Sequence, residues 1–254
     1  MNNLNLDDVN EYVNSNINDF HKKRIEALRG LKLTALISKN PYLFRAKNVI
    51  TAAEFTNQLL DAFLSSSEEK SFGNFLEDLA IFAAEKTSGG HKSTAAGVDL
   101  EFKRENNYYL VSVKSGPKWG NADQHAQLTK SLQNAVTRLK QTHHNINPIA
   151  VLGICYGKTR TSYIHNYNKV VGQNFWYLIS GSKTLYTDII EPLGFLAKDH
   201  NDEFNIEKSN ISNLLIKQFL DQFCDLQTGA INWFKLVETN SGNYDLNKFI
   251  DISG

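Results

Sequence analysis

The chain has 254 residues, of which 41% are hydrophobic, and its 27 Lys and Arg balance its 27 Asp and Glu to give a formal net charge of zero. This composition excludes a disordered chain and a globally basic nucleic-acid-binding protein, so any nucleic-acid site has to be a local basic patch. No apolar run approaches the ~18 residues of a membrane span, and the polar N-terminus does not resemble a signal peptide. The two cysteines, Cys155 and Cys224, lie far apart in apolar surroundings, which predicts reduced thiols in a cytoplasmic protein.

Helical spacing dominates the start of the chain. Val9, Val13 and Ile17 predict one or two helices over residues 6–31, and residues 1–40 are a candidate helical arm. After a break at Asn40-Pro41, two capping signals predict two more helices. They run from Thr51, with Glu54, to about residue 64, and from Ser66, with Glu69, to about residue 86.

Glu77, on the second of these helices, is distinguished by its neighbours. Residues three and four positions away share its face of the helix, and they are small or apolar: Gly73, Ala80, Ile81 and Ala84. A carboxylate in such surroundings needs a partner, because an unpaired buried charge is expensive. The partner is either a core Lys or Arg in a structural ion pair, or a ligand at a functional site.

The stretch 97–121, GVDLEFKRENNYYLVSVKSGPKWGN, predicts an antiparallel hairpin, because apolar and polar residues alternate along both of its strands. Placing six apolar side chains on one face fixes the register. The facing pairs are then Phe102 with Tyr109, Leu100 with Val111, and Val98 with Val113. On the other face Asp99 lies opposite Ser112, and Lys114 is its diagonal neighbour at roughly 7–8 Å between backbones.

The pair of Asp99 and Lys114 suits metal-assisted phosphodiester hydrolysis. At this spacing a divalent cation and a phosphate oxygen fit between the two side chains. Asp99 would hold Mg²⁺, which prefers oxygen ligands, and Lys114 would orient or deprotonate water and offset charge on the phosphate. The alternative is a surface hairpin with a cross-strand ion pair worth less than ~1 kcal/mol.

Asp99, followed by Ser112-Val113-Lys114 on the next strand, resembles the PD-(D/E)XK signature of type II restriction endonucleases. Longer blocks between about residues 40 and 198 resemble the PmeII-type family. They are NPYLFRAKN (40–48), FLSSSEEKSFGNFLEDLA (63–80), VSVKSGPKWGN (111–121), ICYGK (154–158) and GQNFWYLISG (172–181). Two residues depart from the signature: Val98 replaces Pro, and Ser112 replaces Asp or Glu.

This resemblance implies an α/β fold with a restriction-endonuclease-like core, in which a mixed central sheet is flanked by helices, and with additional helices at both ends. The implied activity is Mg²⁺-dependent hydrolysis of double-stranded DNA at a short specific sequence. The implied catalytic residues are Asp99, Lys114, Glu77 and Ser112, and the metal ligands are Asp99, Glu77 and the backbone oxygen of Val113. Because Ser112 is a poor Mg²⁺ ligand, the missing carboxylate is Glu77 or Glu101; the family commonly supplies one from the helix before the hairpin, which favours Glu77.

The residues after the hairpin predict a crossover to a parallel strand. Asn121 and Gln124 predict a capped helix to about residue 142, and 148–156 is an almost unbroken apolar strand of the kind covered on both faces. Parallel strands end at the same edge of a sheet, where α/β folds bind ligands, so the loops at 114–121 and 158–160 should converge. His143-His144, at the end of the predicted helix, fits the helix dipole better than a metal.

A local DNA-binding patch is therefore expected at this edge and in the loop 87–94, with Lys and Arg at phosphates and other side chains near bases or sugars. The candidates are Lys92, Lys118, Trp119, Asn121, Lys158 and Arg160. Trp119 is equally well explained as a core anchor, and His91 is not expected to bind metal because no second His or Cys stands at ligand spacing.

The last third predicts a helical and aromatic stretch over 175–193, an amphipathic helix over 210–226 and a short strand over 231–237. We expect a single nuclease domain over 1–254 with its catalytic core at 66–160, acting as a homodimer because palindromic sites call for two-fold symmetry. Two alternatives stay open: a nuclease for DNA repair or junction resolution, and a DNA-binding protein that has lost its chemistry at Ser112.

Overall fold

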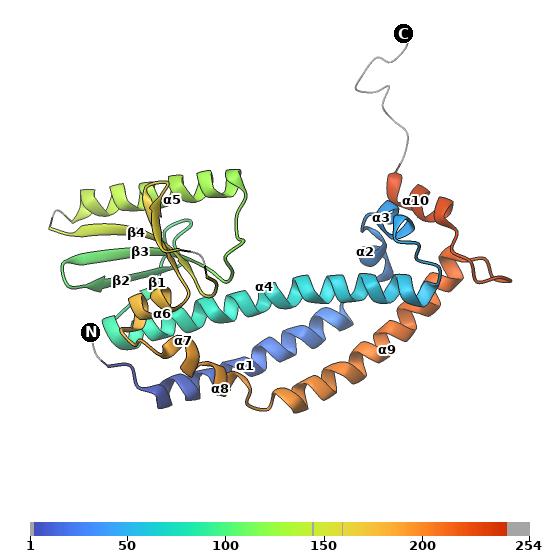
Figure 1. The fold of residues 1–254 in the computed structure, drawn as a ribbon, viewed down its shortest axis with the longest axis horizontal. Helices are drawn as coiled ribbons and strands as arrows, with labels where there is room; N and C mark the ends of the chain where they lie inside the picture. The colour runs from blue at the N-terminus through green and yellow to red at the C-terminus, as the bar shows by residue number, and fades with distance from the viewer. Residues whose placement is uncertain (1–2, 144, 159, 243–254) are drawn as a thin grey trace, which may run out of the picture. The chain divides into compact units, whose positions relative to one another are not determined.

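The computed structural model describes residues 3–143, 145–158 and 160–242, which form two compact units (Figure 1). Unit 1 comprises Met1–Phe20 and Glu69–Lys198, and unit 2 comprises His21–Glu68 and Asp199–Gly254. The single nuclease domain over 1–254, its helical arm and its catalytic core remain predictions. Within the described ranges, no helix combines the length and the apolar character needed to cross a membrane.

Unit 1 is built on a mixed six-stranded sheet in the order β1-β2-β3-β4-β6-β5. The strands are β1 (His91–Lys92), β2 (Leu100–Arg104), β3 (Asn107–Lys114), β4 (Asn147–Ile154), β5 (Ser162–Ile164) and β6 (Tyr167–Val171). The strands β3, β4 and β6 are parallel to one another, whereas β1, β2 and β5 pair antiparallel with their neighbours. The predicted α/β fold with a mixed sheet flanked by helices is confirmed.

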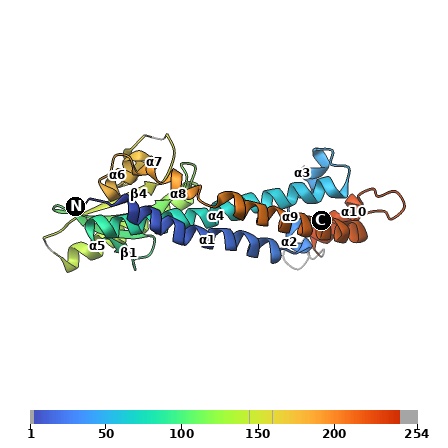
Figure 2. The same ribbon diagram turned by 90° about the horizontal axis from the view of Figure 1, so that it is seen from below.

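Helices cover both faces of this sheet. On one face lies α5 (Ala122–Thr142), whose Leu128 and Leu132 share a core with Leu110 of β3. On the other face lie the start of α1 (Leu6–Arg29), the second half of α4 (Ala52–Ser88), and the short helices α6 (Gln173–Ser180), α7 (Leu185–Asp188) and α8 (Ile190–Leu193). Figure 2 shows α1 beside α4, where Lys86 Nζ lies 3.3 Å from Asp8 Oδ2.

Unit 2 is helical. It contains the end of α1 from His21, the first half of α4, and α2 (Leu33–Ile37), α3 (Pro41–Ala46), nearly all of α9 (Ala197–Phe223), and α10 (Trp233–Ser241). Its core is rich in aromatic residues, with the Phe55 ring 4.7 Å from that of Phe219 and 5.7 Å from that of Trp233, between centroids.

The hairpin register is confirmed for two of its three predicted pairs, Phe102 with Tyr109 and Leu100 with Val111. Val98 is the exception, since it shares the core under α5 with Leu110 rather than the face that holds Leu100. The ladder begins only at Leu100, and the Val98 amide instead donates to the carbonyl of Ala95 at 3.1 Å. The chain therefore turns at Val98 and presents it to the opposite face.

Three predictions about helices were wrong in part. The two helices expected at 51–64 and 66–86 are the single helix α4, because Ser66 Oγ donates to the carbonyl of Ala62 within the helix and does not cap a new one. The stretch 175–193 divides into α6, α7 and α8, and Gly181 ends α6 in the left-handed conformation, at a φ of 73°. The amphipathic helix expected from residue 210 begins much earlier, at Ala197.

Two predictions about strands were also wrong. Residues 231–237 lie mostly in α10, because the Asn232 side chain accepts a hydrogen bond from the Lys235 amide and begins a helix. The loop expected at 87–94 contains β1, which pairs with β2. The capped helix α5 and its parallel crossover from β3 to β4 agree with the sequence, and Asn121 and Gln124 form the expected capping box.

Candidate active site

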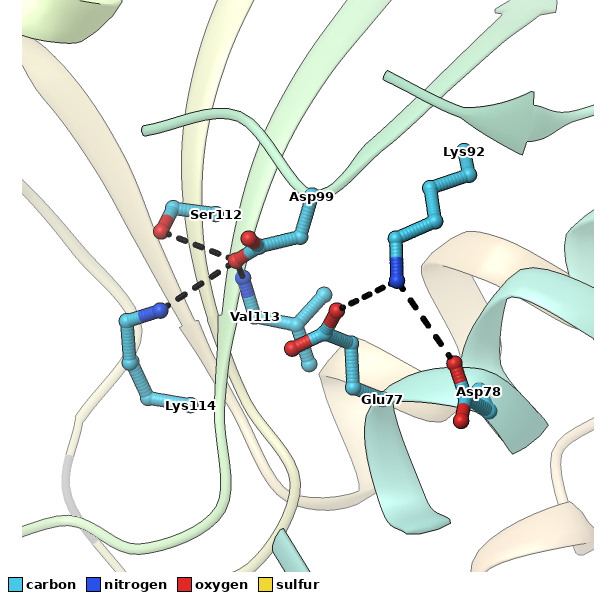
Figure 3. Close-up of polar contacts among 7 residues, drawn as sticks. All are labelled: Glu77, Asp78, Lys92, Asp99, Ser112, Val113 and Lys114. Carbon is cyan, nitrogen blue, oxygen red and sulfur yellow. Dashed lines mark hydrogen bonds and ion pairs between the residues drawn. The ribbon is translucent and has the colours of Figure 1, made fainter. Parts of the chain in front are cut away.

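Asp99 lies where the chain enters β2, and three groups converge on its carboxylate (Figure 3). Its Oδ2 atom accepts hydrogen bonds from the Val113 amide at 2.7 Å, from Ser112 Oγ at 3.2 Å and from Lys114 Nζ at 3.2 Å. The Asp99 amide donates to the carbonyl of Val111 at 2.8 Å, which fixes the backbone against β3. In the described part of the chain, Asp99 Oδ1 has no hydrogen-bond partner.

Lys114 ends β3 and touches Asp99 directly. The sequence predicted these two residues as diagonal neighbours across the hairpin, and their side chains form an ion pair, with Lys114 Nζ 3.2 Å from Asp99 Oδ2. The Lys114 ammonium also lies 5.5 Å from the centroid of the Trp119 ring, within the range of a cation–π interaction. The aromatic ring and the carboxylate together restrict the positions that this ammonium can take.

Glu77 approaches the same region from α4, and 23% of its side chain is exposed. Its ion-pair partner is Lys92 of β1, whose Nζ lies 3.5 Å from Glu77 Oε1 and 3.9 Å from Asp78 Oδ1. Burial raises the pKa of Glu77, and the negative charge of Asp99 raises it further; Lys92 and Lys114 oppose this. Two carboxylates and two ammonium groups therefore interact at one edge of the sheet.

Glu101, the other candidate for the missing carboxylate, accepts hydrogen bonds from two uncharged side chains. Its Oε1 accepts from Ser93 Oγ at 2.5 Å, and its Oε2 accepts from the hydroxyl of Tyr108 at 2.8 Å. Both oxygens therefore have a protein partner. Burial, and then the hydrogen bond to Glu101, raises the pKa of Tyr108 to about 12.

The oxygen atoms around Asp99 fit a hard divalent cation better than a soft one. Mg²⁺ is commonly held by one or two carboxylates with water completing its shell. Glu77 and Asp99 supply two carboxylates, and the Val113 carbonyl supplies a third oxygen, because the N–H and C=O of a strand residue point to the same side and the N–H faces Asp99. Among the residues that the structure describes, no three His, Cys, Asp or Glu side chains gather as a closed metal site.

The two loops expected to converge do so. The Tyr156 amide donates to the carbonyl of Ser115 at 3.2 Å, and a Cβ on Gly157 would lie 2.9 Å from the ring of Pro117. Lys118, Lys158 and Arg160 are exposed on these loops. Thr159 and His144 lie outside the described residues.

Two other DNA-contact candidates have structural partners. Asn121 Oδ1 accepts from the Gln124 amide at 2.9 Å, so this atom caps α5. Trp119 is half-buried and packs edge-on against His125, with 5.2 Å between ring centroids. The ring of His125 in turn lies 3.0 Å from the hydroxyl of Tyr167, measured from Nδ1.

Sequence reasoning missed the contact between Lys92 and Glu77, and it missed His125. Lys92 lies in a polar stretch that carried no signal of a partner on a helix. His125 stands four residues after the predicted cap Asn121, on a helix face that reaches Trp119 only in the folded chain. Helical spacing places such a residue on a face but does not reveal what lies beneath it.

A comparison with models of protein families identifies the family of this chain. The model of the type II restriction endonuclease EcoO109I family matches residues 7–201, which span most of the chain and include every residue placed around Asp99. The search of curated proteins finds no match. Restriction endonucleases are nucleases that act on DNA and generally use a divalent metal. The chain thus belongs to the type II restriction endonuclease EcoO109I family.

Proposed function

We propose that this chain is a restriction endonuclease that uses Mg²⁺ to hydrolyse double-stranded DNA at a short specific sequence, with a site of the PD-(D/E)XK type. The observation that carries the proposal is the meeting of Lys114 with Asp99, 3.2 Å apart, beside the carboxylate of Glu77. The resemblance to the PmeII-type family supports the same chemistry.

Asp99, Glu77 and the backbone oxygen of Val113 would hold the Mg²⁺. When bound, this ion supplies a Lewis acid and offsets negative charge on the phosphate. The two carboxylates suit a cation, because burial, and then the negative charge of Asp99, disfavours ionised Glu77 and raises its pKa. Lys92 already places one positive charge beside Glu77.

Three residues of β3 act on Asp99 or on the scissile phosphate. Ser112 and the Val113 amide donate to Asp99 Oδ2, which orients the carboxylate and leaves Oδ1 for the metal. Ser112 is thus a positioning residue in place of a carboxylate. The Lys114 ammonium orients the attacking water and stabilises charge that develops on the phosphate oxygens.

The exposed cations Lys92, Lys118, Lys158 and Arg160 contact DNA phosphates, while Trp119 and Asn121 lie near the sugars or bases. A homodimer follows from the two-fold symmetry of palindromic sites. The free thiols of Cys155 and Cys224 suit the reducing cytoplasm, where incoming DNA would be cut.

The test is a digest of several phage genomes with Mg²⁺, followed by sequencing of the fragment ends. Discrete fragments with one shared end sequence support the proposal. Cleavage confined to branched or damaged DNA favours a repair nuclease, and binding with no cleavage of any substrate favours a DNA-binding protein without activity.

Two variants link the activity to the site. Asp99→Ala and Lys114→Ala should each lower the cleavage rate at least as far as loss of one preorganised charge-stabilising group, about 10²–10³-fold. Specific DNA binding should persist, because neither side chain is assigned to base edges. If either variant cut nearly as fast as the wild type, the assignment of that residue would be wrong.

A further inference from the structure

A cavity of about 710 Å³ opens beside the candidate active site, at the carboxyl ends of β4 and β6 and against α6, α7 and α8. This volume lies in the range of small-molecule sites, about 300–1,000 Å³. Its floor is apolar and includes the buried side chains of Leu76, Cys155 and Trp176. The Trp176 indole donates to the carbonyl of Cys155 at 2.8 Å, which fixes the floor.

The charge of the lining differs from that of the whole chain. Lys158 and Arg160 stand at the rim, and none of the lining residues that the structure describes is acidic. The chain as a whole has equal numbers of acidic and basic residues. This local excess of positive charge favours an anionic ligand.

The remaining lining offers flat aromatic surfaces and hydrogen-bonding side chains. Tyr156 and Tyr186 line the cavity and are 56% and 41% exposed, as expected of rings that can receive a ligand. Thr161, Gln173 and Asn174 add a hydroxyl and two amides, and Asn174 Nδ2 donates to Thr161 Oγ1 at 3.1 Å. A planar ring with polar edges, joined to a phosphate, matches all of these groups.

The cavity adjoins the site through its floor. The Cys155 amide donates to the carbonyl of Lys114 at 2.9 Å, and Leu76 precedes Glu77 on α4. Burial and the negative charge of Glu77 raise the pKa of the Cys155 thiol to about 12, and the positive charge of Lys114 opposes this rise. The charges of Glu77 and Lys114 are therefore felt at the cavity floor. A ligand here would lie next to the scissile phosphate.

We propose that this cavity receives one unstacked nucleotide of the DNA substrate, with its base against Tyr156 and Tyr186, its edge on Thr161, Gln173 and Asn174, and its phosphate at Lys158 and Arg160. A base stacked within a duplex cannot enter a concave cavity, so the nucleotide leaves the stack when DNA binds. The inference rests on the proposed function and deepens it, because the cavity becomes a determinant of which sequence is cut.

The test uses duplexes that carry the cleavage sequence found by the phage digest, with 2-aminopurine at successive positions. Binding of the wild-type protein in EDTA, which prevents cleavage, should raise the fluorescence at one position next to the cut, because an unstacked 2-aminopurine is no longer quenched. Gln173→Glu places a negative charge at the rim and should remove this rise and lower kcat/KM for cleavage by roughly tenfold.

Two further variants keep the test decisive. Gln141→Glu makes the same chemical change on the exposed end of α5, at the opposite edge of the sheet, and should leave fluorescence and cleavage unchanged. Tyr186→Leu removes a stacking surface and should weaken binding about fivefold or more. Circular dichroism establishes that each variant is folded.

Flat fluorescence at every position, in a protein that cuts its sequence normally, would overturn the inference and leave the proposed function intact. So would wild-type behaviour of both Gln173→Glu and Tyr186→Leu. A wild-type protein that cuts no DNA would overturn the proposed function, and the inference with it.

Discussion

The two units use charged residues in different ways. In unit 2 the ion pairs of the described residues join helix to helix, such as Arg29 with Glu207 at 2.9 Å and Lys208 with Asp61 at 2.7 Å. In unit 1 two carboxylates, Glu77 and Asp99, are close enough for the charge of one to raise the pKa of the other. Burial and, after it, the charge of Asp99 disfavour ionised Glu77, which costs stability when no metal ion is bound.

This difference separates the part of the chain that is built for chemistry from the part built for packing. A carboxylate with a raised pKa, held beside a second carboxylate at a strand edge, is typical of functional sites. The core of unit 2 is instead made of large apolar side chains, including Phe55 and Phe219, which are both at most 1% exposed. Substitutions in unit 1 should therefore change the reaction, whereas substitutions in unit 2 should change stability.

The largest effect is expected at Glu77. Glu77→Gln removes a proposed metal ligand and should reduce the cleavage rate by several orders of magnitude at saturating Mg²⁺. Glu101→Gln is the matched control, because Glu101 lies in the same unit but its oxygens are bonded to Ser93 and Tyr108. Glu101→Gln should reduce the cleavage rate only slightly. If Glu101→Gln lost more activity than Glu77→Gln while both variants were folded, Glu101 would be the residue that supplies the carboxylate.

The same variant also tests the cost of placing like charges together. Because its pKa is raised, ionised Glu77 is disfavoured in the folded state, and the stability of the metal-free protein should fall as the pH rises through that raised pKa. Glu77→Gln should lack this loss, so the two proteins should converge at low pH and the variant should be the more stable above the raised pKa. Thermal unfolding in EDTA, from low pH to above the raised pKa, measures the stability of both proteins. Equal stability of the two proteins at every pH would show that ionised Glu77 does not destabilise the folded state.

The next effect concerns the core of unit 2. Phe219→Ala should lower the free energy of unfolding by about 3–5 kcal/mol through lost burial and a cavity. Phe234 on α10 is 84% exposed, so Phe234→Ala should stay within about 0.5 kcal/mol of the wild type. Urea denaturation measures both.

Cleavage per folded molecule should be unchanged by Phe219→Ala, measured where the variant is still folded. A large fall in kcat with intact folding would mean that unit 2 contributes to the chemistry, and the division between the units would no longer hold.

Much of the site could be predicted because it rests on local patterns. Alternation of apolar and polar residues gave the register that pairs Leu100 with Val111 and brings Lys114 to Asp99. The capping box of Asn121 and Gln124 placed α5 correctly. These signals involve residues that are close in sequence or are fixed by a short hairpin.

The rest depends on contacts that no local pattern encodes. Ser66 and Glu69 form a valid capping signal, but the helix continues because its backbone hydrogen bonds continue through this point. Lys92 reaches Glu77 only because β1 adds to the edge of the sheet. The cavity likewise needs β6, which the sequence did not predict, to bring Gln173 near Lys158.

A smaller effect is expected from the exposed cations of unit 1. Lys118→Gln and Arg160→Gln should each weaken specific and non-specific DNA binding alike and reduce the slope of log K against log salt by about one unit. Lys235→Gln, on α10 of unit 2, is the matched control and should leave the slope unchanged. Fluorescence anisotropy over a range of salt measures this, and unchanged slopes for both unit 1 variants would mean that this edge does not face DNA.

The smallest effect concerns a histidine of unit 2. His21 stacks on His200 with 4.3 Å between ring centroids, and burial, then the charges of His200 and Arg24, lower its pKa from 6.5 to about 4. The unfolded chain takes up a proton near pH 6.5 that the folded chain takes up only near pH 4, so stability that is fully present above pH 6.5 is lost as the pH falls to about 4. His21→Asn removes this titration and should give a flatter dependence of unfolding free energy on pH over that window, measured by urea denaturation. Cleavage at neutral pH should be the same in both proteins, because His21 lies in unit 2 and is not assigned to the reaction. Parallel curves of unfolding free energy against pH would contradict the prediction, because they would show that the proton uptake of His21 does not differ between the folded and unfolded chains.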